Sequence, residues 1–90
     1  MIMIFKRFYW SNYYVSETGV VKNNKELILI PQKKNTFLFH ELSINGKTKR
    51  FGLARMVLLC HKPNIDYINL RAKHIDGDPF NNHIDNLTWI

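Results

Sequence analysis

The sequence contains little that could crosslink the chain or anchor it in a membrane. Cys60 is its single cysteine, so no intrachain disulfide can form and we expect an intracellular protein. The apolar start of the chain is interrupted by Lys6 and Arg7. It is too short to span a bilayer, and no small-residue cleavage site follows it. No stretch is rich enough in Gly, Pro or Ser to be a linker, so residues 1–90 predict one small domain without a membrane partner.

Acidic residues are scarce in the first half of the chain. The net charge is +6. Residues 1–50 hold nine Lys/Arg against three acids, which gives +6, whereas residues 51–90 hold four of each, which gives zero. A basic half beside a neutral half with clustered carboxylates fits nucleic-acid binding next to a polar site. The alternative is that the charge serves solubility alone.

The residue patterns predict an α+β chain. Three runs with strand character lie at 8–16, 26–34 and 36–44, and a strong turn signal follows at 45–47. A turn at Gly19 separates the first two, and the second is ended by Pro31 and a polar turn at 33–35. Residues 53–60 are apolar except for Arg55, which predicts a buried helix that ends before Pro63. Beyond it we expect a strand within 67–75, a loop at 76–82, a short helical turn at 83–87 and an extended end.

The basic residues fall mostly on the predicted strands and turns, and strands can enter the major groove of DNA. For each lysine alone, a solvated turn residue is the alternative. For Arg55 we favour an ion pair with Asp66 or Asp85 over a phosphate contact. The candidate DNA-binding residues are Lys22, Lys25, Lys33, Lys34, Lys47, Lys49, Arg50, Arg71 and Lys73.

Metal sites of the common kinds are not favoured. The carboxylates after His74 do not fit a calcium loop, because acceptors do not occupy the alternate positions and no glutamate closes the loop. A zinc site would need convergence of Cys60, His61, His74 and His83, and we expect Cys60 in the core instead.

The C-terminal segment "HIDGDPFNNHIDNLTWI" resembles the phage-type HNH homing endonucleases, whose site reads His-x-Asp-Gly, Asn-Asn and Asn-Leu-x-Trp. Upstream, "YYVSETGVVKN" and "ARMVLLCHKPN" are similar to other stretches of the same proteins, so the resemblance extends from Trp10 onward. The matching C-terminal positions are His74, Asp76, Gly77, Asn81, Asn82, Asn86, Leu87 and Trp89.

The resemblance implies roles for these residues. His74 would be the general base that takes a proton from water, and Asn86 would hold the loop that orients it. A single divalent ion, Mg²⁺ or Mn²⁺, would stabilise the phosphate charge. Two departures argue against that ion: Lys73 stands where the family has a metal ligand, and the chain stops at Ile90 before the helix that carries the last one. We therefore expect no cofactor unless the chain is an active nuclease.

These observations lead to one interpretation and two alternatives. The expected fold is a three-stranded antiparallel sheet with one buried helix (residues 10–62, the DNA-binding part), followed by a truncated ββα-metal, HNH-like element (residues 67–90). The expected function is binding of double-stranded DNA without cleavage, as a regulator, competitor or inhibitor. The alternatives are a metal-dependent HNH nickase, and a protein-binding inhibitor whose surface from Phe5 to Tyr14 docks a host or phage protein. The resemblance further implies a phage or mobile-element origin, and a homodimer would suit so small a DNA-binding chain.

Overall fold

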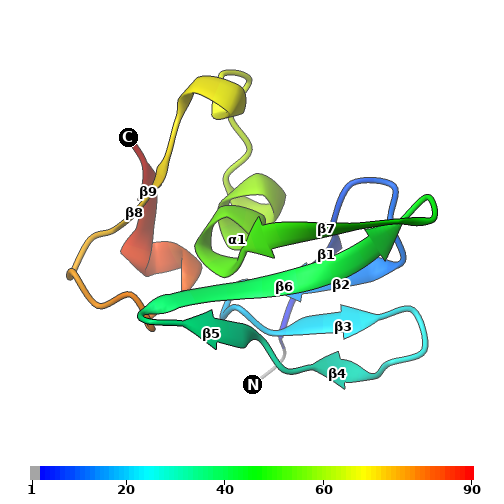
Figure 1. Cartoon of the computed structure of the whole chain (residues 1–90). Coiled ribbons are helices and arrows are strands. Elements are labelled where there is room, and N and C mark those ends of the chain that lie inside the picture. Colours follow the sequence, from blue (N-terminus) through cyan, green and yellow to red (C-terminus); the bar gives the residue numbers. More distant parts are fainter. Residues whose placement is uncertain (1–2) are drawn as a thin grey trace.

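The computed structural model describes residues 3–90, and strands make up most of its regular structure (Figure 1). In chain order the elements are β1 (Phe5–Arg7), β2 (Tyr13–Ser16), β3 (Val21–Asn23), β4 (Ile28–Leu29), β5 (Gln32–Lys34), β6 (Phe37–Ile44), β7 (Lys47–Gly52), α1 (Leu53–His61), η1 (Tyr67–Asn69), β8 (Ala72–His74), η2 (Ile84–Asn86) and β9 (Leu87–Trp89).

The first sheet is antiparallel and has the order β1-β2-β3-β4. The turn between β2 and β3 occurs where it was expected, because Gly19 has a φ of 90° that a side chain would strain. Tyr13 and Val15 point to the same face, as the alternation predicted. Val15 pairs with Val21, and both side chains are buried. This pair fixes the register of the sheet against the core.

The second sheet has the order β5-β6-β7. Asn45 and Gly46 both have positive φ, 53° and 76°, as a tight hairpin turn requires. The second expected run, 26–34, contributes two short strands to different sheets, β4 before Pro31 and β5 after it. Pro31, which has no N–H to donate, lies at the break between them, where the run was expected to end. The α+β class is confirmed, but the three expected runs do not form one three-stranded sheet, and β7 was not expected as a strand.

The predicted helix is α1, which lies between the sheets and the C-terminal strands (Figure 1). It contacts β1, β2, β6 and β7 as well as β8, β9 and η2. Its last turn closes with the Lys62 N–H donating to the Leu58 carbonyl at 2.8 Å, one residue before Pro63. The core cluster comprises Phe8, Val15, Val21, Leu42, Leu53, Met56, Val57, Leu58 and Leu87.

One histidine is buried in the inner face of β6. His40 is 4% exposed, and within residues 3–90 its Nε2 has no hydrogen-bond partner. Burial lowers the pKa of His40, because an unpaired charge would lose its hydration. The ring is therefore neutral at neutral pH, and the inner face of the sheet remains uncharged there.

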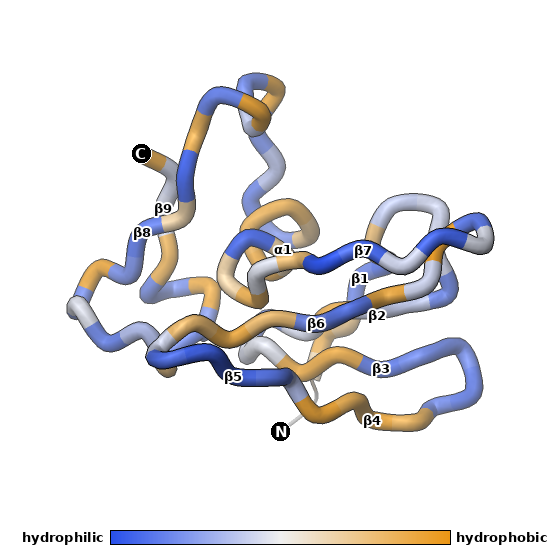
Figure 2. Tube along the Cα trace, in the orientation of Figure 1, coloured by the Kyte–Doolittle hydropathy of each residue, from blue (hydrophilic) through white to orange (hydrophobic). Residues whose placement is uncertain are grey.

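Polarity differs between the middle and the outer strands of the second sheet. In Figure 2, α1 and much of β6 are hydrophobic, whereas β5 and most of β7 are hydrophilic. Within the described part of the chain, no helix has the length and apolarity needed to cross a membrane.

Shortening one buried side chain of α1 tests how strongly the helix packs in the core. Leu58 is fully buried, so Leu58→Ala should lower the free energy of unfolding by about 2–5 kcal/mol through reduced burial and a residual cavity. Leu27 is 60% exposed, and Leu27→Ala should change it by less than about 0.5 kcal/mol. Urea denaturation followed by circular dichroism measures both, and equal effects would contradict the packing described.

Candidate nucleic-acid interface and the loop around His74

The C-terminal strands present the residues singled out in the sequence. β8 pairs with β9 in antiparallel fashion, with His74 opposite Leu87, and Leu87 is buried in the core. The loop between the strands is tied to the first sheet, since the Ile84 N–H donates to the Glu17 carbonyl at 2.7 Å. Residues 67–69, expected in a strand, form the short helix η1, and only 72–74 of that run are extended. The expected helical turn is η2.

Three side chains hold the loop after His74. The Asn86 amide donates to Asp76 Oδ1 and to the Asn81 carbonyl, each at 2.9 Å, and its Oδ1 accepts from the Asp76 N–H at 3.0 Å. Asn81 Nδ2 donates to Asp76 Oδ2 at 3.0 Å, and the Asp78 N–H donates to Asp76 Oδ1 at 2.8 Å. These bonds, first from Asn81 and then from Asp78 and Asn86, lower the pKa of Asp76. The loop is therefore held by its own amides and one carboxylate.

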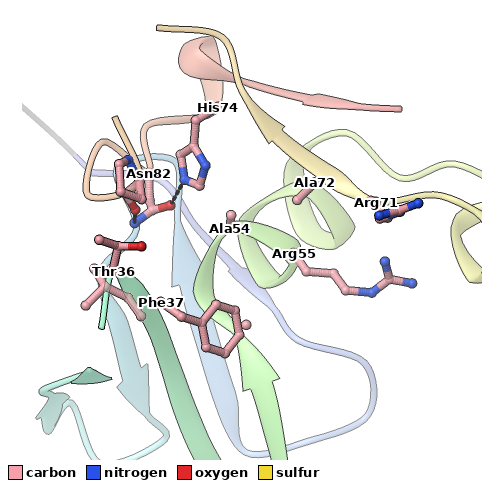
Figure 3. A pocket seen from close by; sticks show the side chains of 11 residues that line it. Thr36, Phe37, Ala54, Arg55, Arg71, Ala72, His74 and Asn82 are labelled. Atoms are coloured by element: carbon pink, nitrogen blue, oxygen red, sulfur yellow. Dashed lines mark hydrogen bonds between the residues drawn. The ribbon is translucent and has the colours of Figure 1, made fainter. Parts of the chain in front are cut away.

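His74 itself is oriented by a different asparagine. Its Nε2–H donates to Oδ1 of Asn82 at 2.7 Å, as the dashed line in Figure 3 shows. Asn82 is buried, and its Nδ2 donates to the Pro79 carbonyl at 3.4 Å. With Nε2 occupied as a donor, the lone pair of a neutral His74 resides on Nδ1. Asn82 was part of the recognised Asn-Asn motif, but the sequence did not show that it would hold the histidine.

His74 and Asn82 border a cavity of about 360 Å³ that also contacts α1 and the start of β6. In Figure 3 two guanidinium groups, those of Arg55 and Arg71, lie on the side of the cavity away from the His74–Asn82 pair. The prediction that Arg55 forms an ion pair with Asp66 or Asp85 is wrong. Arg55 instead donates to the carbonyls of Leu70 at 2.7 Å and Tyr67 at 2.6 Å, because the chain after α1 folds back over the helix.

The side chains around His74 do not suit a divalent cation. The cavity is lined by two arginines and, in the part of the chain described, by no carboxylate. The nearby Asp76 carboxylate is engaged by its own loop. Lys73 is exposed and points to the other side of β8 from His74, because successive strand side chains alternate. Within residues 3–90 no three His, Cys, Asp or Glu side chains come together as metal ligands.

The candidate DNA-binding residues occupy several surfaces rather than one. On β7, Arg50 points to the face of the sheet turned toward solvent. Lys47 and Lys49 point to the opposite face, the one that bears the core, but both remain exposed. Arg50 lies over the Phe39 ring at 4.2 Å and 3.9 Å from Glu41. Lys22 is partly withdrawn from solvent and pairs with Glu26 at 2.6 Å. The remaining exposed candidates are Lys25 on the β3–β4 turn, Lys33 and Lys34 on β5, and Arg71 and Lys73 at β8.

Comparison with known proteins gives one informative similarity. No family model matches the chain, and none of the curated proteins does either. A solved structure that matches is described as showing DNA binding and cleavage by the HNH homing endonuclease I-HmuI, with a TM-score of 0.81 and 28% sequence identity. The match covers all of this chain and 52% of that one, so this chain spans about half the length of that protein. The α+β fold is therefore HNH-like.

The hydrogen bonds that Asp76 accepts within its loop should make the stability of the protein depend on pH. Because the folded pKa of Asp76 is depressed, its contribution is present above the unfolded value of about 3.9 and is lost as the pH falls through the folded value. Asp76→Asn should therefore lower Tm at pH 7, and the gap to the unmodified protein should shrink as the pH falls below the unfolded value of about 3.9. Thermal denaturation over a pH series from 7 into acid measures this, with Asp66→Asn as control for loss of one charge. A gap that stays the same size throughout the series would contradict a stabilising role for the Asp76 carboxylate.

Proposed function

We propose that this chain binds double-stranded DNA through the basic β5-β6-β7 sheet and does not cleave it. The observation that carries the proposal is the charge of that sheet. Residues 32–52 contain five Lys/Arg (33, 34, 47, 49 and 50) and one acid, Glu41, which gives +4. All five basic side chains belong to exposed residues on the two outer strands, β5 and β7.

The arrangement of the cations suits contacts to the phosphate backbone of DNA. Lys34 on β5 pairs with Phe37, and Arg50 on β7 pairs with Glu41. Phe37 and Glu41 are four residues apart on β6, so their side chains and those of their partners lie on the same face of the sheet. Two cations on opposite edges of a narrow ribbon suit phosphates on either side of a groove. The neighbouring Thr48 and Gln32 supply hydrogen-bonding groups on the same face. The similar homing endonuclease is described as binding DNA, which favours nucleic acid over solubility alone.

The absence of cleavage is proposed from the chemistry around His74. The histidine is oriented, with its lone pair on Nδ1, so it retains the geometry of a base. The cavity beside His74 is lined by Arg55 and Arg71 and, within residues 3–90, by none of the carboxylates that a divalent ion needs. A protein that occupies a DNA site without cutting it would act as a regulator, as a competitor for a nuclease target, or as an inhibitor.

Salt-dependent binding tests the duplex interface. Fluorescence anisotropy of a labelled duplex should show a log–log salt slope that becomes shallower by about 0.9 for each phosphate that is no longer neutralised. The double variant Lys34→Gln/Arg50→Gln should therefore shift the slope by nearly two. Lys6→Gln, an exposed cation on β1, is the matched control and should leave the slope unchanged. A slope near zero for the unmodified protein would rule out the phosphate contacts and favour a protein-binding inhibitor.

A plasmid-nicking assay tests the second half of the proposal. In the presence of Mg²⁺ or Mn²⁺, the unmodified protein should nick supercoiled DNA no faster than His74→Ala. Metal-dependent nicking that is abolished in His74→Ala would instead establish the nickase alternative. Asn82→Ala then provides a further check, because removal of the His74 partner would reduce any genuine His74-dependent activity.

A further inference from the structure

A second hollow lies at the end of the molecule opposite His74. It has a volume of about 530 Å³ and lies between the β6–β7 hairpin and the β1–β2 connection. Figure 1 shows that hairpin and β8 at opposite sides of the fold. Its floor includes Ile44 and Phe51, and its walls include Tyr9 and Trp10. We name this hollow the Trp10 groove.

Trp10 is presented to solvent by a fixed turn. The residue is 89% exposed, although a tryptophan normally buries most of its surface. The turn is held by the Ser11 N–H, which donates to the Phe8 carbonyl at 3.1 Å, and by Arg7 Nε, which donates to the Ser11 carbonyl at 2.8 Å. Tyr9 has a φ of 52°, a left-handed conformation that is unfavourable for a bulky residue. The chain thus accepts backbone strain at a turn that leaves an indole ring uncovered.

The Tyr9 side of the groove is rigid. The Phe8 ring packs on the rings of Tyr9 and Phe51, with centroid distances of 4.6 and 5.0 Å, and Phe8 is fully buried. The aromatic wall is therefore continuous with the core. The side of the groove formed by Tyr9 and Phe51 is therefore preformed, and a ligand loses little free energy in ordering it.

Two cations also line the groove, on the same strand as Phe51. Lys47 and Lys49 are alternate residues of β7, so their side chains point to the same side, about 6.8 Å apart along the strand. Among residues 3–90, no acidic residue lines the groove. The groove therefore places aromatic and apolar side chains beside two positive charges. This combination is complementary to a ligand in which a flat ring is attached to a polyanion.

We propose that the Trp10 groove binds an unpaired nucleotide of single-stranded nucleic acid. The base stacks on Trp10 above Ile44 and Phe51, and the phosphates on either side of it meet Lys47 and Lys49. Stacking on an aromatic ring does not depend on the identity of the base. A duplex keeps its bases stacked on one another, so it cannot use Trp10 in this way. The site is separate from the Lys34–Arg50 face proposed for double-stranded DNA.

Anisotropy of a labelled twelve-residue oligo(dT) tests this site. Trp10→Ala should weaken binding by about 5- to 150-fold, the effect of removing the stacking of one base, and Trp10→Phe should restore most of it. Lys47→Gln/Lys49→Gln should make the log–log salt slope shallower by about 0.7 for each phosphate that is no longer neutralised. Phe80→Ala, which removes an exposed aromatic residue of the β8–β9 loop, is the matched control, and circular dichroism verifies the fold of each variant.

The same variants measured on a duplex separate the two proposals. Weaker binding of Trp10→Ala to oligo(dT), with duplex affinity unchanged within about twofold, supports the Trp10 groove. Unchanged affinity of Trp10→Ala for oligo(dT) overturns it, as does failure of the unmodified protein to bind oligo(dT) where it binds duplex. An equal weakening on both substrates overturns the preference for an unpaired base. The effect of Trp10→Ala on oligo(dT) affinity does not depend on the Lys34–Arg50 face, whereas the duplex measurements report on that face.

Discussion

Packing around α1 is the constraint on which the rest of the structure depends. The helix has nine residues, and a helix of that length is marginal in water by itself. Leu53, Met56, Val57 and Leu58 are all buried, so it is stable because it is covered from several directions. The sheets need the helix equally, since β8 and β9 have only three residues each and a short two-stranded unit does not persist alone. Burial of Leu87 against α1 places His74 relative to the basic sheet.

The loop after His74 is held by hydrogen bonds among its own residues. Asp76 accepts bonds from the Asp78 N–H and from the amides of Asn81 and Asn86, and Asn86 also fixes the Asp76 N–H. Bonds to a charged acceptor are stronger than neutral ones, and an exposed clamp of several members can order a loop that has little apolar surface. A scaffold of this kind retains its shape whether or not catalysis is retained, so a well-formed loop is no argument for cleavage.

Local chemistry explains which features the sequence could predict. The Gly19 and Asn45–Gly46 turns, the helix end before Pro63 and the short helical turn at η2 each follow from residues within a few positions of one another. Pro31 was expected to end the second strand run. The strand β5 just beyond it was missed because Lys33, Lys34 and Asn35 are typical of a polar turn, and only pairing with β6 makes residues 32–34 extended. The partners of Arg55 were missed for a different reason: carbonyls of Tyr67 and Leu70 carry no sequence signal, whereas the aspartates considered for it do.

The candidate sites depend even more on contacts between residues that are distant in the sequence. His74 and Asn86 could be singled out from a motif, but the bond from His74 to Asn82 needs the loop to close. The Trp10 groove joins residues 9 and 10 with residues 44–51, and no local pattern connects them. The aromatic stretch from Phe5 to Tyr14 suggested a protein-docking surface, but Phe8 is buried in the core while Trp10 is exposed beside lysines that come from a distant part of the sequence.

The strand β7 shows why clustered charge in a sequence is a poor guide to one interface. Lys47, Lys49 and Arg50 lie within four residues of one another and look like a single basic patch. The pleat of the strand sends Lys47 and Lys49 toward Trp10 and sends Arg50 to the solvent face beside Glu41. Adjacent cations thus serve surfaces with different companions: aromatic rings on one side, and Lys34 with polar residues on the other. An aromatic ring can stack only on an exposed base, whereas a cation can contact any phosphate. The residues next to each group of cations therefore decide whether that surface suits single-stranded or double-stranded nucleic acid.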